Sequence, residues 1–245
     1  MFQHFRLTRI TRPLNFRALA GIGIVAGVAA IAGCNTDTTT TSPNGPQGLV
    51  QFINAAPRYS SVDLYVDTMD VAPSTTYGTG QSISLTPLSN PRQFVVRLTG
   101  DTTTLASGQL LIVDQAVSTV ILTQHTVGGN LLILPDTVSA PPANDIGLRI
   151  VNASPSAATV DMYVTGADST LATPTATNVA FEGSSTYVTV PVGTVRVRVT
   201  TAGTKTVLLD IDASSLTAGQ VRTVLLVDSA GGGLPVTWLA VPDRG

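Results

Sequence analysis

The sequence contains one motif twice, and this duplication limits how the chain can fold. Asn54-Ala55-Ala56-Pro57 followed by Val62-Asp63-Leu64-Tyr65-Val66 returns as Asn152-Ala153-Ser154-Pro155 followed by Val160-Asp161-Met162-Tyr163-Val164. A constant offset of 98 residues, from 54 to 152, maps one copy onto the other without a gap. Repetition at a fixed spacing indicates a repeated structural unit. With 245 residues, the chain has room for two domains of ordinary size.

The composition indicates β-structure. Only 11% of the residues are charged, and 22 Gly and 15 Pro separate segments rich in Val and Thr, which favours strands and turns over helices. Four arginines lie ahead of Cys34, so 9 of the 13 basic residues remain in the body of the chain against 15 acidic ones. A mildly acidic body without clustered basic residues argues against a nucleic-acid partner.

Each copy contains about seven short runs with strand character. In the second copy Val195, Val197 and Val199 alternate with polar residues, as in a strand with one buried face. Short strands with regular turn signals predict an all-β chain with two tandem immunoglobulin-like antiparallel β-sandwich domains. The expected strands cover 49–53, 62–66, 82–85, 94–98, 109–113, 117–124 and 131–134, then 148–151, 160–164, 186–190, 195–200, 207–211, 221–227 and 237–241.

The N-terminus has the parts of an export signal. Residues 1–17 carry four arginines and no acidic residue, and residues 18–31 are an uninterrupted apolar run, which is the order of a signal peptide. The run is shorter than the about 20 residues that a spanning helix needs. It ends at Ile31-Ala32-Gly33-Cys34, which resembles the lipobox of bacterial lipoproteins and implies lipidation of Cys34. An uncleaved anchor helix with an incidental thiol is the alternative.

Cys34 is the only cysteine, so its lipidation excludes a disulfide within the chain. The segment after it contains four consecutive Thr and then Ser-Pro-Asn-Gly-Pro, which is typical of a flexible stalk. We predict an exported protein that a lipid anchors to a membrane of the cell envelope. The expected segments are a signal peptide (1–33), the lipidated Cys and stalk (34–47), a first sandwich (48–137), a Pro-rich linker (138–145) and a second sandwich (146–245).

The duplicated motif also resembles a known family. An aliphatic residue, Asn-Ala-Ser/Ala-Pro, then Val-Asp-aliphatic-Tyr-Val and a later Val-Arg-Val strand is similar to the bacterial family catalogued as domain of unknown function 4397. The resemblance covers nearly all of residues 48–245 as two tandem copies. Many members have His where Asn54 and Asn152 stand, and often Asp-Ala after the Pro, where this chain has Arg58-Tyr59 and Ser156-Ala157. The resemblance implies no established activity.

The sequence offers little for catalysis. His4 leaves with the predicted signal peptide, so His125 is the only imidazole of the mature chain. One His and a lipidated Cys supply neither a Ser-His-Asp nor a Cys-His set, and neither a zinc cluster nor a phosphate-binding loop occurs. Gly231-Gly232-Gly233 is interpreted as a hairpin tip. We expect no enzyme activity and no cofactor, and a hydrolase that pairs Asp63 with His125 is the weakest hypothesis.

A weak calcium candidate consists of Asp63, Asp67 and Asp70, which lie near one strand end. Calcium prefers such oxygen ligands, but the spacing matches no dedicated calcium loop. Apart from this candidate, no metal is expected.

The repeated motif is expected to be structural. Asp63 and Asp161 are predicted to accept hydrogen bonds from the backbone of the preceding Pro-containing connection. Tyr65 and Tyr163 stand on the same face as a small candidate aromatic surface, although covering a sheet is the commoner use of such residues. The full set of motif residues is Asn54, Pro57, Asp63 and Tyr65 with Asn152, Pro155, Asp161 and Tyr163.

Two binding functions remain in view. The leading hypothesis is a structural or protein-interaction module whose partner is another envelope protein. The alternative is a module for glycan or cell-wall polymer, which requires several exposed aromatic rings side by side. The candidate rings are Tyr59, Tyr65, Tyr77, Tyr163, Tyr187 and Trp238 with three Phe.

Overall fold

The computed structural model describes residues 45–136, 140–166, 169–191, 193, 195–212 and 217–244, and residues 242–244 are described by their backbone alone. The predicted signal peptide, Cys34 and residues 35–44 lie outside this set. Residues Thr41–Gly245 belong to one compact unit. In the part of the chain that the structure describes, no helix has the length and apolar character needed to cross a membrane.

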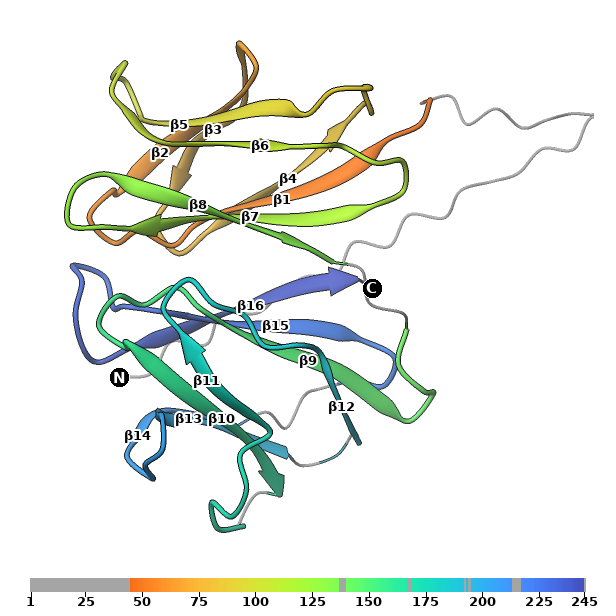
Figure 1. The fold of residues 1–245 in the computed structure, drawn as a ribbon, viewed down its shortest axis with the longest axis vertical. Coiled ribbons are helices and arrows are strands. Elements are labelled where there is room, and N and C mark those ends of the chain that lie inside the picture. Colours follow the sequence, from red (N-terminus) through yellow and green to blue (C-terminus); the bar gives the residue numbers. More distant parts are fainter. Residues whose placement is uncertain are drawn as a thin grey trace, which may run out of the picture. The chain divides into compact units, whose positions relative to one another are not determined.

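The first copy forms two four-stranded sheets (Figure 1). One sheet has the order β4-β1-β7-β8 and the other has the order β3-β2-β5-β6. Neighbouring strands are antiparallel except β1 and β7, which are parallel. The strands are β1 (Gly48–Asn54), β2 (Ser61–Val66), β3 (Met69–Thr76), β4 (Gly80–Leu85), β5 (Arg92–Leu98), β6 (Thr104–Leu110), β7 (Val117–Gln124) and β8 (Gly129–Pro135).

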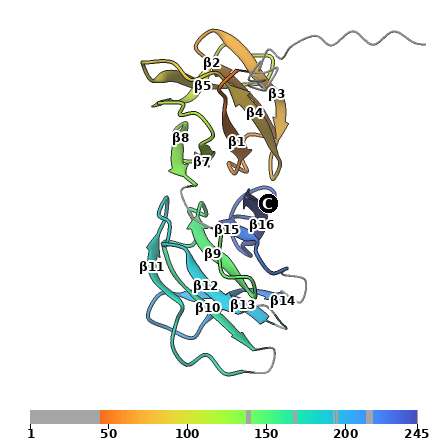
Figure 2. The same cartoon turned by 90° about the vertical axis from the view of Figure 1, so that its right-hand side faces the viewer.

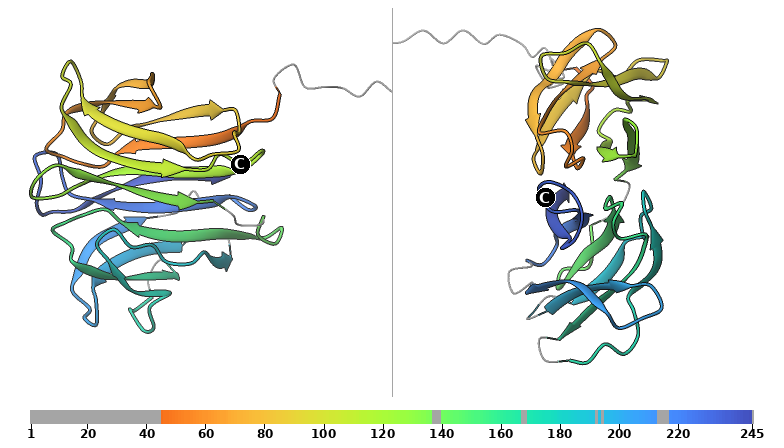
Figure 3. Two further views of the ribbon diagram at one scale, coloured as in Figure 1. Left: turned by 45° about the horizontal axis from the view of Figure 1, so that its top comes forward. Right: turned by 90° about the vertical axis from the view of Figure 1, so that its left-hand side faces the viewer.

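The second copy repeats this arrangement strand for strand. Its sheets have the orders β12-β9-β15-β16 and β11-β10-β13-β14, and β9 and β15 form the parallel pair. Figure 2 and Figure 3 show the sheets of each copy as separate layers. The strands are β9 (Asp145–Asn152), β10 (Thr159–Gly166), β11 (Ala176–Ala180), β12 (Val188–Pro191), β13 (Val195–Thr201), β14 (Val207–Asp212), β15 (Val221–Val227) and β16 (Thr237–Arg244).

The predicted all-β class with two tandem sandwiches is confirmed, but each copy has eight strands where seven were predicted. The missed strands, β3 and β11, both lie at a sheet edge. Pro73 interrupts the sequence of β3, and most of that strand is exposed, so neither apolar alternation nor composition marks it. The strand expected at 109–113 is also wrong, because β6 lies at Thr104–Leu110.

Each sandwich has its own apolar core between its two sheets. Phe52, Leu64 and Phe94 are fully buried in the first core, and Ile150, Met162 and Leu226 are fully buried in the second. The predicted inward alternation on β13 holds, because Val197 and Val199 are buried. Burial of side chains of this size stabilises a fold by roughly 1.5–3 kcal/mol each.

A third apolar cluster joins the two copies. It contains Ile53, Ala55 and Ile121 from the first copy together with their counterparts Val151, Ala153 and Leu225 from the second. The counterparts follow from the strand registers, in which Ile53 pairs with Ile121 and Val151 pairs with Leu225. Each copy therefore contributes the same outer sheet face, as in an isologous dimer interface.

Contacts at this interface are reciprocal. The Tyr77 hydroxyl of the first copy donates a hydrogen bond to the Asp228 carbonyl of the second. Burial, followed by the nearby Asp228 charge, raises the pKa of Tyr77 to about 12. Phe181 occupies the position of Tyr77 in the second copy, and its ring lies 5.6 Å from the ring of His125 in the first. The duplicated chain thus buries against itself a face that a single copy would expose.

Candidate functional site

The repeated asparagine fixes one edge of each sandwich. The Asn54 side chain accepts a hydrogen bond from Ala56 N at 3.1 Å and donates to the carbonyls of Tyr59 and Thr75 at 2.9 and 3.2 Å. Asn152 makes the same three contacts, with Ser154 N and with the carbonyls of Ala157 and Val179. Both side chains are fully buried. They attach the connection that follows the first strand of each copy to the edge strand of the opposite sheet.

The repeated aspartate supports a bulge in that edge strand, and the predicted bonding partner is wrong. Asp63 accepts a hydrogen bond from Ser74 N, and Asp161 accepts one from Asn178 N, both at 2.8 Å. Ser74 and Asn178 have positive φ angles of 52° and 55° and lie where the strand register shifts. The carboxylate therefore binds an N–H that the bulge removes from the ladder, and not the Pro-containing connection. In that connection Pro57 is buried, while its counterpart Pro155 is exposed.

Asp63, Asp67 and Asp70 do not come together, because the described residues contain no group of three carboxylate, His or Cys side chains that could hold a metal ion. Asp67 instead binds Arg92 Nε at 2.7 Å and Gln93 N at 3.0 Å. These two hydrogen bonds, the one from Gln93 first, lower the pKa of Asp67. Burial, and then the nearby Asp63 charge, raises the pKa of Asp70.

The tyrosines do not form an open aromatic surface. The Arg97 guanidinium lies 4.7 Å from the centre of the Tyr65 ring, and the Lys205 ammonium lies 4.4 Å from that of Tyr163. Lys205 also donates a hydrogen bond to the Tyr163 hydroxyl at 2.8 Å. Arg149 covers Tyr187 in the same way, at 4.7 Å. Three of the candidate rings therefore hold protein cations.

His125 does not approach Asp63. It follows β7, whereas Asp63 lies on β2 of the other sheet. His125 Nε2 lies 2.9 Å from Glu182 Oε1 of the second copy. Glu182 also accepts hydrogen bonds from Thr123 and Asn130, so the histidine belongs to a polar clasp at the interface rather than to a hydrolytic pair.

A second group of polar side chains, or second clasp, joins the two copies at the interface. None of its residues belongs to the repeated motif. Arg149 on β9 forms an ion pair with Asp136, which directly follows β8, and both side chains are almost completely buried. Arg149 Nε donates to Thr223 Oγ1 at 2.6 Å, and Thr119 Oγ1 donates to Asp136 at 2.7 Å. The charges thus satisfy one another across the two copies. In the sequence, Asp136 is marked only as part of a Pro135-Asp136 pair that recurs as Pro242-Asp243.

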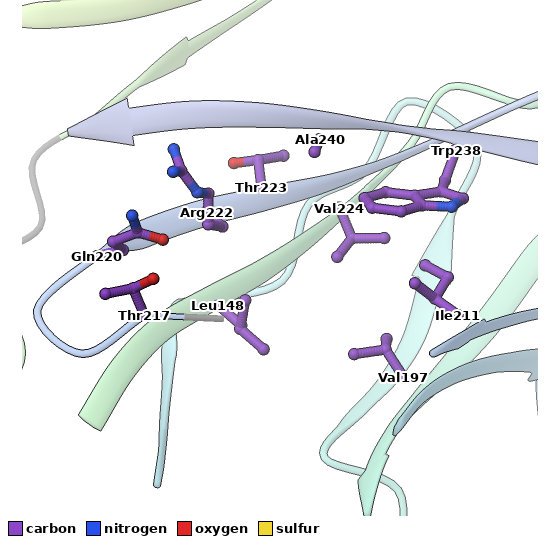
Figure 4. A pocket seen from close by; sticks show the side chains of 10 residues that line it. All are labelled: Leu148, Val197, Ile211, Thr217, Gln220, Arg222, Thr223, Val224, Trp238 and Ala240. Carbon is purple, nitrogen blue, oxygen red and sulfur yellow. The ribbon is translucent and has the colours of Figure 1, made fainter. Parts of the chain in front are cut away.

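The clearest candidate for a ligand site is a cavity of about 230 Å³ inside the second sandwich. Figure 4 shows Trp238 at one end and the polar side chains of Thr217, Gln220 and Arg222 at the other. The apolar residues between these ends come from strands of both sheets. They are Leu148, Val197, Ile211 and Val224, with Ala240 along the β16 wall.

The cavity arises where the copies differ. Strand registers place Val197 and Ala240 where the first copy has Phe94 and Ile133. In the first copy β6 packs against β8, and Ile133 reaches Gly108. No comparable packing joins β14 to β16 among the described residues. The second sandwich is therefore open on the side where the first is closed.

The polar end of the cavity carries the cationic side chain of Arg222. Arg222 is half-buried, and its guanidinium forms no hydrogen bond or ion pair with any described residue. Among the other arginines whose side chains are described, Arg97 lies over the Tyr65 ring without a hydrogen bond from its Nε. The rest form hydrogen bonds or ion pairs, for example Arg92 with Asp67 and Arg196 with Asp210. Trp238 is also half-buried. The alternation of apolar and polar residues on β15 and β16 could not have predicted this site, because the corresponding strands of the first copy alternate in the same way although that sandwich is closed.

Known proteins give a family but no function. No curated protein matches the chain. A solved structure described as "Alpha-glucan binding by a streptococcal virulence factor" is 9% identical, with a TM-score of 0.26 over 73% of this chain and 92% of that chain. The carbohydrate-binding module CBMbc of Eubacterium rectale Amy13K, of family CBM26, is 13% identical, with a TM-score of 0.26 over 81% and 98%.

A structure described as a putative adhesin from Bacteroides ovatus is 11% identical, with a TM-score of 0.22 over 79% of this chain and 95% of that chain. Likenesses at this level carry no argument about ligands. The family described as "Domain of unknown function (DUF4397)" matches residues 48–163 and 147–244, which together span most of the chain. With both copies matched, the chain belongs to the DUF4397 family and carries its domain twice in tandem.

Proposed function

We propose that the chain is a non-catalytic, lipid-anchored protein of the bacterial cell envelope that binds another envelope protein through the open side of its second sandwich. The observation that carries this proposal is the cavity between β14 and β16. In the first copy the corresponding strands, β6 and β8, pack against each other. The N-terminal sequence around Cys34 supports membrane attachment.

The interface between the copies supports the assignment of the site. Because the two outer sheet faces cover each other, they are not available to a partner. The cavity instead combines buried apolar side chains with a half-buried aromatic residue and an arginine at its rim. Tryptophan and arginine are the residue types that most often dominate binding at protein interfaces.

A glycan ligand is the second candidate, and Trp238 is the observation that favours it. Its ring forms one end of the cavity (Figure 4), and sugars stack on such rings. The floor of Leu148, Val197 and Ile211 offers no partner for sugar hydroxyls, and burial of an unpaired hydroxyl costs about 1–3 kcal/mol. A glycan would therefore contact the rim rather than the interior.

Photo-crosslinking in cells tests the proposal. A photoreactive amino acid at Thr217, at the cavity rim, is expected to trap one discrete protein, and the Cys34→Ala form is expected to lose this adduct. The exposed Val127, in the β7–β8 hairpin of the first copy, provides the control position and is expected to trap none. Retention in a cell-wall fraction without any protein adduct from Thr217 would replace the protein partner with a polymer.

A further inference from the structure

We infer that the cavity of the second sandwich binds an apolar carboxylate, with the apolar part against Trp238 and the carboxylate at Arg222. This inference rests on the proposed function, because it names the chemistry that a partner or ligand brings to the same site. Two features of one cavity support it: apolar residues line the interior, and the Arg222 guanidinium has no partner among the described residues (Figure 4).

The volume limits the size of the bound group. A cavity of about 150 Å³ lined by apolar side chains holds benzene, and pockets for drug-sized ligands measure roughly 300–1,000 Å³. At about 230 Å³, this cavity lies between these limits. It fits one ring or short aliphatic chain with a single head group.

The two ends of the cavity require different chemistry. Val197, Ile211 and Val224 line the interior without a hydrogen-bonding side-chain atom, so a polar group there would be desolvated without compensation. At the other end, Arg222 presents a planar set of N–H donors that matches a carboxylate. Gln220 and Thr217 lie beside it and offer further donors. An amphipathic anion satisfies both ends at once.

The first copy lacks both requirements. Ser118 stands at the register position of Arg222, because Val50 pairs with Ser118 as Leu148 pairs with Arg222. Ile133 stands at the position of Ala240 and fills the space between β6 and β8. The first sandwich therefore provides an internal reference in which neither the charge nor the space is present.

The shared chemistry has two sources. One is a free small acid, and the other is the terminal carboxylate of a partner polypeptide that ends in an apolar residue. Phenylacetate against phenylacetamide tests the first source, since the two differ in the charged group alone. A short peptide ending in Phe, with a free or an amidated C-terminus, tests the second.

Trp238 is the only tryptophan of the chain, so intrinsic fluorescence of the full chain reports directly on the cavity. Phenylacetate or the free-acid peptide is expected to change this fluorescence saturably and to bind at least about tenfold more tightly than its amide. Arg222→Gln is expected to abolish the preference for the acid. Ala240→Ile, which installs the residue of the first copy, is expected to abolish the response to acid and amide alike.

Arg92→Gln, in the first sandwich, is the charge control and is expected to bind like the natural chain. Equal affinity for acid and amide in the natural chain would overturn the inferred ligand chemistry. A silent Trp238 with every probe, while Thr217 still crosslinks a protein, overturns this inference and leaves the proposed function standing. Loss of both the fluorescence response and the crosslink overturns both.

Discussion

The two copies share the hydrogen bonds that hold each sandwich together, but one sandwich is closed and the other contains a cavity. Asn54 and Asn152 make the same three hydrogen bonds, and Asp63 and Asp161 bind the same bulge. By contrast, the first sandwich closes through β6 and β8, while the second holds a cavity. A duplicated domain has thus kept its scaffold contacts in both copies and placed its candidate binding chemistry in one.

The two copies also differ at the two edges, or rims, of the interface between them, one at Glu182 and the other at Gly78. Glu182 and its counterpart Gly78 both have positive φ, at 61° and 78°. Glycine adopts this conformation freely, whereas glutamate is strained there. The strain is compensated because the Glu182 carboxylate binds Thr123, His125 and Asn130 across the interface. One rim is therefore clasped by charged groups, while the rim at Gly78 lines a groove beside β4 and β16.

The largest expected effect tests whether the shared face is equivalent in the two copies. Ile121→Asp and Leu225→Asp each place an unpaired carboxylate at a fully buried position of the interface. Each variant is expected to lose more than about 4 kcal/mol of unfolding free energy, measured by urea denaturation with circular dichroism. The exposed Val127→Asp control is expected to change it by less than about 0.5 kcal/mol. A large loss in only one of the two variants contradicts the isologous interface.

A somewhat smaller effect is expected at the buried ion pair. Arg149→Met leaves Asp136 buried without its partner, which costs roughly 3–5 kcal/mol. The double variant Arg149→Met with Asp136→Leu removes both charges and is expected to recover most of this loss. Gln51 holds the register position of Arg149 in the first copy, and Gln51→Met is expected to cost about 1 kcal/mol. Thermal unfolding of the natural chain and the three variants distinguishes these outcomes. Equal losses of stability in Arg149→Met and Gln51→Met would contradict the asymmetry between the two edges of the interface.

The scaffold was predictable because it depends on patterns that are local and repeated. The offset of 98 residues between Asn54 and Asn152 revealed the tandem copies, and alternation around Val197 and Val199 marked a strand with one buried face. The edge strands β3 and β11 escaped prediction. Only one face of an edge strand is buried, and bulges at Ser74 and Asn178 break its two-residue period.

The candidate site was not predictable from such patterns. Its space depends on residues such as Val197 and Ala240, which line one cavity from different sheets, and this arrangement exists only once the two sheets have packed. Arg222 reads in the sequence as an ordinary outward residue between Val221 and Thr223. Tyr163 was predicted to stand on an outer face, yet its side chain is buried beneath Lys205. Tertiary contacts of this kind leave no periodic signal in one sequence.

The smallest expected effect concerns the Glu182 clasp and its dependence on pH. Burial raises the pKa of Glu182, but hydrogen bonds from Thr123, His125 and Asn130 outweigh it and leave the pKa lowered from 4.5. A carboxyl with a lowered pKa in the folded state adds stability above its unfolded pKa. This contribution is lost as the pH falls below 4.5 and through the folded value. The Glu182 side chain is half-buried and its partner His125 is exposed, so solvent screening limits the contribution to about 1 kcal/mol.

Glu182→Gln isolates this contribution, since it keeps the shape and the strained backbone position but removes the charge. The unfolding free energy of the natural chain is expected to exceed that of the variant at pH 7, and the gap is expected to close below about pH 3. Gly78→Ala, at the counterpart position, also has a positive φ to strain but adds no carboxylate, so its effect is expected to be independent of pH. A gap for Glu182→Gln that stays constant between pH 7 and pH 3 would show that the clasp works through shape alone, and the rims would then differ in packing rather than in charge.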